Sequence, residues 1–332
     1  MKIIRKADLS KWIDTLTAEN QVVAPLEHNG QYFYEPIDSS SQIDWEFLRP
    51  ILPIKEYFFN PTEQLLTFIK QGSNVIIRET LQEKQRVIIG VRPCDAHGLK
   101  VLDAMFLDAE PADHNYQAHR ERTILVGMAC SEALPTCFCT SLGEGPHSPN
   151  DLDILLTEVE DGFIVDLVSD RGNQLAASMN LIEEAMDRPA PPEMRLIPFP
   201  EQSAWEELFH LPIWEQTAER CLSCRVCAYV CPTCRCFDVR DEIIATQDGK
   251  QEFERIRVWD SCASEAYRKI AGGHNPRKAK AERLRNRFYC KFDYYPSQYG
   301  PLACTGCGRC IELCPVNIDI TETLNQLAEV VR

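Results

Sequence analysis

Short apolar runs alternate with segments of helical periodicity over the first half of the chain. Two of the runs, Arg86–Val91 and residues 123–129, are predicted to be buried strands. Between them, apolar residues recur at helical spacing over residues 99–106 and predict a helix. A strand, helix, strand order implies parallel pairing, which brings the carboxyl ends of both strands to one edge of a sheet. The pattern therefore predicts an α/β N-terminal domain over residues 1–190.

Weaker patterns predict further elements in this domain. Helical spacing occurs over residues 8–16 and again over 60–69, where an Asn-Pro pair is typical of a helix start. Residues 74–78 are predicted to form a strand. Alternation over residues 153–168, on both sides of an Asp-Gly pair, predicts a β-hairpin. A short helix is predicted near residues 174–186.

A proline-rich stretch at residues 188–200 is predicted to be a linker. Beyond it, helices are predicted around residues 205–209 and 214–220, and the second leads directly into a cysteine-rich run. A strand and a basic stretch are predicted within residues 256–291. Residues 201–332 are therefore predicted to form a second, α-rich domain.

Composition limits the partners and the location of the protein. The 332 residues suffice for two domains, and 50 acidic against 35 basic side chains give a formal net charge of −15. This balance argues against nucleic-acid binding and suits charge-steered docking to proteins. The first residues lack the apolar core of a signal peptide, and no apolar run approaches the ~20 residues of a membrane helix. We therefore expect a cytoplasmic protein without direct membrane insertion, whose 16 cysteines stay reduced.

Eight of the cysteines fall in two copies of one pattern. Residues 221–232 read C-x2-C-x2-C-x3-C-P, and the pattern returns at residues 304–315. Bacterial ferredoxins with two 4Fe–4S clusters contain this run, and the fourth cysteine of each run ligates the other cluster. The x2 spacing lets one tight loop supply three thiolates, and the x3 step begins a helix that carries the fourth away. Zinc sites do not require a third cysteine at this spacing, and disulfides need an oxidising compartment.

Crossed ligation is therefore predicted in a ferredoxin-like C-terminal domain that holds two 4Fe–4S clusters and has a long insertion between the runs. The predicted ligands of the first cluster are Cys221, Cys224, Cys227 and Cys314. The predicted ligands of the second cluster are Cys304, Cys307, Cys310 and Cys231.

The cysteines of the N-terminal half indicate a third metal site. Cys94 and Cys130 each follow a predicted strand, and Cys137 and Cys139 lie in the loop after the second strand. Two strand ends and an adjacent loop can bring four thiols to one point, as a 4Fe–4S cluster requires. Cys94 also lies at a predicted helix N-terminus, which favours its thiolate. We predict a third 4Fe–4S cluster here; the alternatives are zinc or buried thiols without a metal.

Four further cysteines belong to none of these sets. Cys234, Cys236 and Cys262 either tune the clusters through S–H or backbone contacts or are ordinary core residues, and Cys290 is interpreted as an ordinary core residue. The charge run over residues 277–287 is interpreted as a solvated helix face, with docking of an acidic partner as the alternative.

The sequence contains no motif that indicates a catalytic centre. Neither cysteine run has a serine, histidine or carboxylate set beside it that would suggest a substrate pocket. The chain has no GxGxxG fingerprint, P-loop or nucleophile elbow. We therefore predict no catalytic residue and expect no flavin on this chain.

Taken together, these motifs resemble a known family: the iron–sulfur β subunits of sulfhydrogenases (soluble nickel–iron hydrogenases) and the related A subunits of anaerobic sulfite reductases. The resemblance extends over most of the chain from about residue 85 onward. It is carried by residues 90–95, 137–146, 221–238, 259–262, 273–277 and 299–320. The sequence departs from the family at residues 263–272, which are amphipathic here, and at Cys290.

The resemblance implies a non-catalytic electron-transfer subunit of a multisubunit oxidoreductase. Such subunits relay electrons in a hetero-oligomer between a flavoprotein subunit that handles a nicotinamide nucleotide and a catalytic subunit of hydrogenase or sulfite/sulfur reductase type. One alternative is an oxidoreductase in its own right, with a flavin or small substrate at the strand-end edge of the N-terminal domain. Another is a structural role, in which the clusters hold the fold together.

Overall fold

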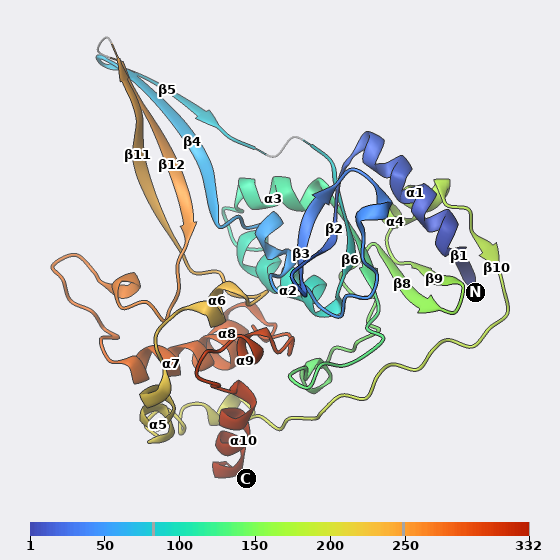
Figure 1. Ribbon diagram of the computed structural model, residues 1–332. Helices are drawn as coiled ribbons and strands as arrows, with labels where there is room; N and C mark the ends of the chain where they lie inside the picture. Colours follow the sequence, from blue (N-terminus) through green and yellow to red (C-terminus); the bar gives the residue numbers. More distant parts are fainter. Residues whose placement is uncertain (82–83, 248–249, 332) are drawn as a thin grey trace.

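The structure is a computed structural model that describes residues 1–81, 84–247 and 250–331. Within these residues the strands form one eight-stranded and one four-stranded sheet (Figure 1). The larger sheet has the order β10-β1-β9-β8-β7-β6-β2-β3. Its strands are β1 (Lys2–Arg5), β2 (Gln21–His28), β3 (Gln31–Ile37), β6 (Arg86–Val91), β7 (Thr123–Met128), β8 (Ile154–Val159), β9 (Gly162–Leu167) and β10 (Ile182–Glu183).

The centre of this sheet is parallel, as the sequence pattern predicts. Strand β6 pairs in parallel with β2 on one side and with β7 on the other, and β7 pairs in parallel with β8. The outer strands pair antiparallel, including the predicted hairpin of β8 and β9. Strands β6 and β7 therefore end at the same edge of the sheet, where open α/β sheets bind ligands.

Helices cover both faces of the large sheet. Helix α1 (Lys6–Glu19) packs on one face, against alternate residues of β6 such as Val87 and Ile89. Helix α2 (Pro93–Phe106) packs on the other, against Ile88 and Val91, and α3 (His114–Glu121) contributes Tyr116 to this core. Because β6 is apolar on both faces, it is buried along its whole length, as the centre of a parallel sheet requires.

The four-stranded sheet joins segments from the two halves of the sequence. Its order is β11-β12-β4-β5, all antiparallel, with β4 at Thr62–Gln71, β5 at Asn74–Glu79, β11 at Phe237–Gln247 and β12 at Lys250–Trp259. It projects as an arm from the rest of the molecule (Figure 1). The helix predicted over residues 60–69 is wrong. Strand pairing on both edges of β4 satisfies its backbone groups and overrides the local helix-start signal.

Outside β11 and β12, the regular structure of residues 201–331 is helical, and residues 188–200 contain no helix or strand. Their helices are α5 (Ile213–Arg220), α6 (Val226–Tyr229), α7 (Lys280–Tyr289), α8 (Tyr295–Tyr299), α9 (Arg309–Glu312) and α10 (Ile320–Val330). They share a core that includes Trp205, Trp214, Phe288 and Leu324.

Two further helix predictions fail. Around residues 205–209 the chain forms turns after a short 3-10 helix, Gln202–Ala204, and it buries Trp205 and Leu208 without a regular helix. The segment near residues 174–186 contains only the end of α4 (Asp170–Leu175) and a 3-10 turn, after which β10 pairs with β1. Tertiary packing overrides weak helical periodicity in both places.

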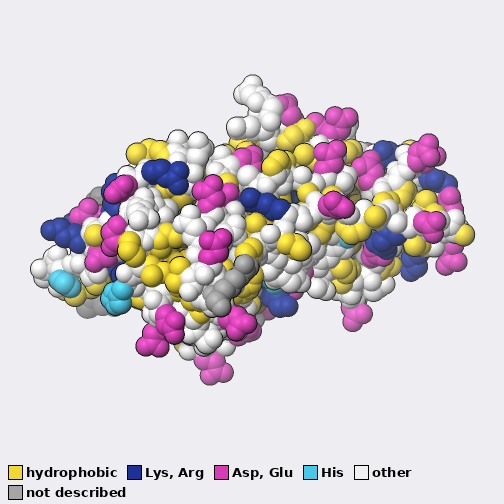
Figure 2. All heavy atoms as spheres, turned by 90° about the horizontal axis from the view of Figure 1, so that it is seen from below, with side chains coloured by type: hydrophobic (Ala, Val, Ile, Leu, Met, Phe, Trp, Pro, Cys, Tyr) yellow, Lys and Arg dark blue, Asp and Glu magenta, His cyan; other side chains and the backbone are white. Residues whose placement is uncertain are grey.

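The surface agrees with the acidic composition. Figure 2 shows acidic side chains scattered over the face that it presents, interspersed with basic and apolar ones. Among the described residues, no helix is long and apolar enough to cross a membrane.

Candidate metal centres

Cysteines of the two ferredoxin-type runs meet in crossed sets. The cavity called site 1 is lined by the first three cysteines of the first run and the last of the second. The cavity called site 2 is lined by the first three cysteines of the second run and the last of the first. The third cysteine of each run lies in a short helix, α6 or α9, and these helices pack together. Site 1 thus contains Cys221, Cys224, Cys227 and Cys314, and site 2 contains Cys231, Cys304, Cys307 and Cys310.

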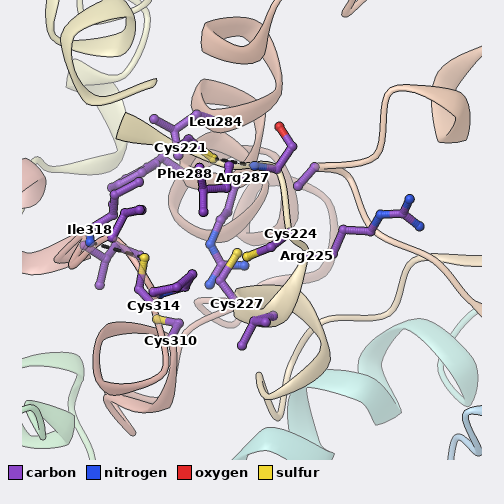
Figure 3. A pocket seen from close by; sticks show the side chains of 17 residues that line it. Cys221, Cys224, Arg225, Cys227, Leu284, Arg287, Phe288, Cys310, Cys314 and Ile318 are labelled. Atoms are coloured by element: carbon purple, nitrogen blue, oxygen red, sulfur yellow. Dashed lines mark hydrogen bonds between the residues drawn. The ribbon is translucent and has the colours of Figure 1, made fainter. Parts of the chain in front are cut away.

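The close view of site 1 shows the cysteines around a common space, with Arg287 reaching in from α7 (Figure 3). Backbone N–H groups point at two of the sulfurs. Ser223 N lies 3.4 Å from the Cys221 Sγ, and Ile318 N lies 3.2 Å from the Cys314 Sγ (Figure 3). Such N–H···S contacts stabilise thiolate charge and tune a bound cluster.

The two cysteine loops have the same backbone conformation. The second residue between the first and second cysteines has a positive φ, 55° at Ser223 and 64° at Gly306. The first residue between the second and third cysteines also has a positive φ, 70° at Arg225 and 75° at Gly308. The repeated motif is therefore a repeated local structure.

Contact with the N-terminal domain explains why only the second loop uses glycine. A Cβ on Gly306 would lie 2.5 Å from the Cys139 backbone nitrogen, and one on Gly308 would lie 2.4 Å from the Thr136 carbonyl oxygen. The loop also accepts a hydrogen bond of 2.8 Å from Phe138 N to Gly306 O. The first loop lies at the surface, with Cys224 exposed.

The structure also brings the four N-terminal cysteines onto one cavity, called site 3. Cys94 lies in the first turn of α2, Cys130 follows β7, and Cys137 and Cys139 come from the next loop, as predicted. Cys307 of site 2 lines the same cavity.

Buried guanidinium groups face site 3. Arg49 Nη1 lies 3.7 Å from the Cys137 Sγ. Arg92, which is 2% exposed, lines the cavity and donates to the Ala129 carbonyl at 2.8 Å. These cations suit a cavity in which four thiolates would gather negative charge.

Cys94 lies at the N-terminus of α2, as expected, but it is also deeply enclosed. Burial, followed by the charge of Asp95, raises the pKa of Cys94 well above its usual value. A bound metal would deprotonate such a thiol outright, so the donor set fits a metal centre better than a reactive free thiolate.

Two cations that sequence reasoning missed lie among the cysteines of the C-terminal half. Lys291 Nζ contacts the Cys231 Sγ at 3.1 Å and is 3% exposed. Although burial opposes its charge, the Cys231 thiolate raises the pKa of Lys291. Arg287 lines sites 1 and 2; burial opposes its charge too, but Cys227 and Cys234 raise its pKa.

The interpretation of residues 277–287 as a solvated face is therefore wrong for part of this stretch. Arg283, Asn286 and Arg287 of α7 are each 6% exposed. Arg283 donates to the carbonyl oxygens of Arg277 and Lys278, while Arg287 points into the cysteine sites. A charge run on a helix looks the same in sequence whether water or thiolates surround it.

The last four cysteines gather on a fourth cavity, called site 4. It is lined by Cys234, Cys236, Cys262 and Cys290. Cys290 is half-buried and lines this cavity with the other three, a grouping that sequence spacing did not indicate.

Sulfur spacing separates these sites from mononuclear zinc centres. Within the described residues, the trio of potential ligands whose atoms all lie within 4.8 Å of one another is His97, Glu144 and Asp151. In a tetrathiolate zinc site, Zn–S bonds of about 2.3 Å place the sulfurs only about 3.8 Å apart. Among the described residues, no three thiols of sites 1 to 4 are drawn together in this way, and a cluster does not require it, because each of its thiolates ligates a different iron.

Sites 1, 2 and 3 adjoin one another in series. Cys310 lines both site 1 and site 2, and Cys307 lines both site 2 and site 3. Site 2 is thus the middle of the series. Site 1 forms one end of the series, and its Cys224 is exposed.

Comparison with known proteins agrees with this geometry. Residues 220–318 match the family model described as a 4Fe-4S dicluster domain. The chain is also 31% identical over 334 residues to the sulfhydrogenase 2 subunit beta of Pyrococcus furiosus, and the match covers 96% of each chain. The chain belongs to the sulfhydrogenase β-subunit family. The dicluster domain contains every cysteine of sites 1, 2 and 4, whereas site 3 lies outside it. No solved structure matches this member of the family.

Proposed function

We propose that this sulfhydrogenase β-type chain relays electrons through iron–sulfur clusters. The observation that carries the proposal is the series of cysteine-lined cavities in which neighbouring sites share a lining cysteine. When bound, a 4Fe–4S cluster supplies a one-electron redox centre. The chain itself contributes the thiolates, excludes water and fixes the order of the sites.

In this proposal each cavity of the series holds one 4Fe–4S cluster. Cys221, Cys224, Cys227 and Cys314 ligate the cluster of site 1, and Cys231, Cys304, Cys307 and Cys310 ligate that of site 2. Cys94, Cys130, Cys137 and Cys139 ligate a third cluster in site 3. The donor sets support this assignment, since each cavity offers four cysteines and at least one buried cation.

Electrons then enter and leave at the two ends of the series. We infer that a flavoprotein subunit that handles a nicotinamide nucleotide serves one end, and that a hydrogenase-type or sulfur-reducing catalytic subunit serves the other. The exposed Cys224 supports transfer to a partner at site 1. All 16 cysteines are free thiols in the structure, which suits a cytoplasmic complex.

The four-stranded arm offers a surface for another subunit of such a complex. No residue of β5 is buried, and Val75, Ile76 and Ile77 are 54%, 53% and 59% exposed. On β11, Ile243 is 64% exposed. Exposed apolar side chains on the two edge strands of a projecting sheet suit contact with another protein. We propose that a partner subunit of the complex covers them.

An anaerobic redox titration monitored by electron paramagnetic resonance tests the relay. We expect reversible one-electron reduction of several clusters in the purified chain with its co-purifying subunits. Replacing the bridging Cys307→Ser should leave signals from sites 1 and 3 but slow electron transfer between them at least tenfold. Clusters that show no reversible reduction would indicate a purely structural role.

A further inference from the structure

Four cysteines that no ferredoxin-type pattern includes lie around one cavity. Cys234 and Cys236 follow the first run, Cys262 follows β12, and Cys290 follows α7. All four line site 4, a cavity of about 310 Å³. Segments that lie far apart in the sequence therefore converge on this point.

The base of the arm brings two of these thiols together. Phe237 of β11 pairs with Trp259 of β12, and just below this pair Asp260 N donates to the Cys236 carbonyl at 2.9 Å. The chain then turns so that Cys236 and Cys262 line the same cavity. The strand pairing thus sets the position of one half of the site.

Guanidinium groups contact the other two thiols. Arg287 Nη1 lies 3.6 Å from the Cys234 Sγ, and Arg235 Nη2 lies 3.7 Å from the Cys290 Sγ. Lys291 also lines the cavity. Site 3 has the same kind of contact between a guanidinium and a cysteine sulfur, since Arg49 Nη1 lies 3.7 Å from the Cys137 Sγ.

We propose that site 4 binds an additional iron–sulfur cluster of the 4Fe–4S type, ligated by Cys234, Cys236, Cys262 and Cys290. The cysteine inventory supports this assignment. The chain has 16 cysteines, and each of them lines at least one of the four cavities. Once twelve are assigned to sites 1 to 3, the remaining four are those that line site 4.

Charge argues against ordinary core thiols at this place. A core cysteine packs as a small apolar side chain, whereas these four face the guanidinium groups of Arg235 and Arg287 and the ammonium group of Lys291. Buried cations without a counter-charge are unfavourable. Four thiolates on a cluster carry excess negative charge and compensate them.

The sulfur spacing argues against a single zinc ion here too. Among the described residues, the trio of ligand atoms within 4.8 Å of one another contains no cysteine. A cubane accommodates wider spacing because its four irons each take one thiolate. The site therefore fits a cluster in the number and identity of its donors.

Metal content of the full-length chain, purified without air, tests the proposal. We compare iron and acid-labile sulfide in the wild type with those in a Cys236→Ser/Cys262→Ser variant. The variant should lose about four irons and about four sulfides per chain, one cubane, whatever the total in the wild type. Met105→Leu, which alters the lining of the same cavity without removing a thiol, should keep the wild-type content.

A second variant guards against misfolding of the first. Cys290→Ser changes one half-buried ligand, and it should shift the resonance signal of one cluster while the far-ultraviolet circular dichroism stays unchanged. Equal iron in the wild type and the double variant, with unchanged resonance spectra in Cys290→Ser, would overturn the proposal. Loss of about one zinc per chain in place of four irons would also overturn it.

Discussion

The guanidinium of Arg309 and the carboxylate of Asp95 form a buried bidentate ion pair between the two halves of the chain. Nη1 and Nη2 lie 2.5 Å and 2.7 Å from the two carboxylate oxygens, and both residues are 1% exposed. Arg309 Nε donates to the Pro50 carbonyl at 2.9 Å. Because Asp95 follows Cys94 of site 3 and Arg309 precedes Cys310 of site 2, the pair fixes these two sites relative to each other.

Removing one partner of this pair should destabilise the protein. Asp95→Asn leaves a buried guanidinium without its counter-charge, which costs about 3–5 kcal/mol. We expect a clearly lower thermal unfolding midpoint, measured anaerobically by circular dichroism. Asp108→Asn, an isosteric change of an exposed aspartate, is the control and should leave the midpoint within a degree or so. Equal midpoints in the two variants would contradict the inferred role of the pair.

Lys291 should set the reduction potential of the cluster in site 2. Its ammonium lies 3.1 Å from the Cys231 Sγ and stabilises the added negative charge of the reduced cluster. Lys291→Gln should lower the potential. If the lost interaction is about 1.4 kcal/mol, the shift is roughly 59 mV for a one-electron couple. Lys291→Arg keeps the charge and should restore most of the potential, measured by redox titration. A potential unchanged in Lys291→Gln would count against this role.

The glycines of the second loop should be required for site 3. A methyl group on Gly308 would lie 2.4 Å from the Thr136 carbonyl, so Gly308→Ala should displace the loop that carries Cys137 and Cys139. We expect loss of about four irons per chain, the content of one cubane. Gly273→Ala is the control, because Gly273 also has a positive φ, 83°, but a methyl group added there would meet no atom within 4 Å. Equal iron in both variants would show that steric contact is not the cause.

Glu56 should make stability depend on pH. Burial raises the pKa of its carboxyl to about 7 from an ordinary value of 4.5. The folded chain therefore holds this proton more tightly than the unfolded chain, so the stability that this group contributes is highest below pH 4.5 and falls as pH rises toward 7. Glu56→Gln should remove that loss and raise stability at pH 8 by roughly 1–2 kcal/mol, since partial exposure reduces the effect.

The measurement for Glu56 is the thermal midpoint of wild type and variant between about pH 5 and pH 8. The difference should grow with pH and level off above about pH 7. Glu46→Gln, at an exposed position, should show no such trend. A difference between wild type and Glu56→Gln that is constant with pH would exclude titration of Glu56 as its cause.

The sequence predicted the cysteine sets that local spacing or strand order determines. The x2 and x3 steps place Cys221 and Cys314 on one cavity because short helices carry the fourth cysteine across. Cys94 and Cys130 meet because parallel strands end at one edge. These relationships follow from backbone geometry within a few residues or within one strand–helix–strand unit.

Relationships that depend on distant pairing could not be predicted. Residues 60–69 look helical in isolation, but β4 pairs with β5 on one edge and with β12, which comes from the other half of the sequence, on the other. Site 4 needs the base of that arm to bring Cys236 to Cys262, and no spacing rule links either to Cys290. Lys291 and Arg287 are buried beside cysteines. They come from a basic stretch, and its composition alone does not distinguish a solvent-exposed helix from one that lines a metal site.

The pairing of β4 with β12 also sets an order for synthesis. Gln71 cannot find its partner Lys250 until about 180 further residues have been translated, which takes on the order of ten to forty seconds at typical rates. During that time the β4–β5 hairpin presents an unpaired edge and the apolar side chains Val75 to Ile77. Such an edge invites pairing with other chains. The nascent subunit therefore has an aggregation-prone interval that ends only when its second half emerges from the ribosome.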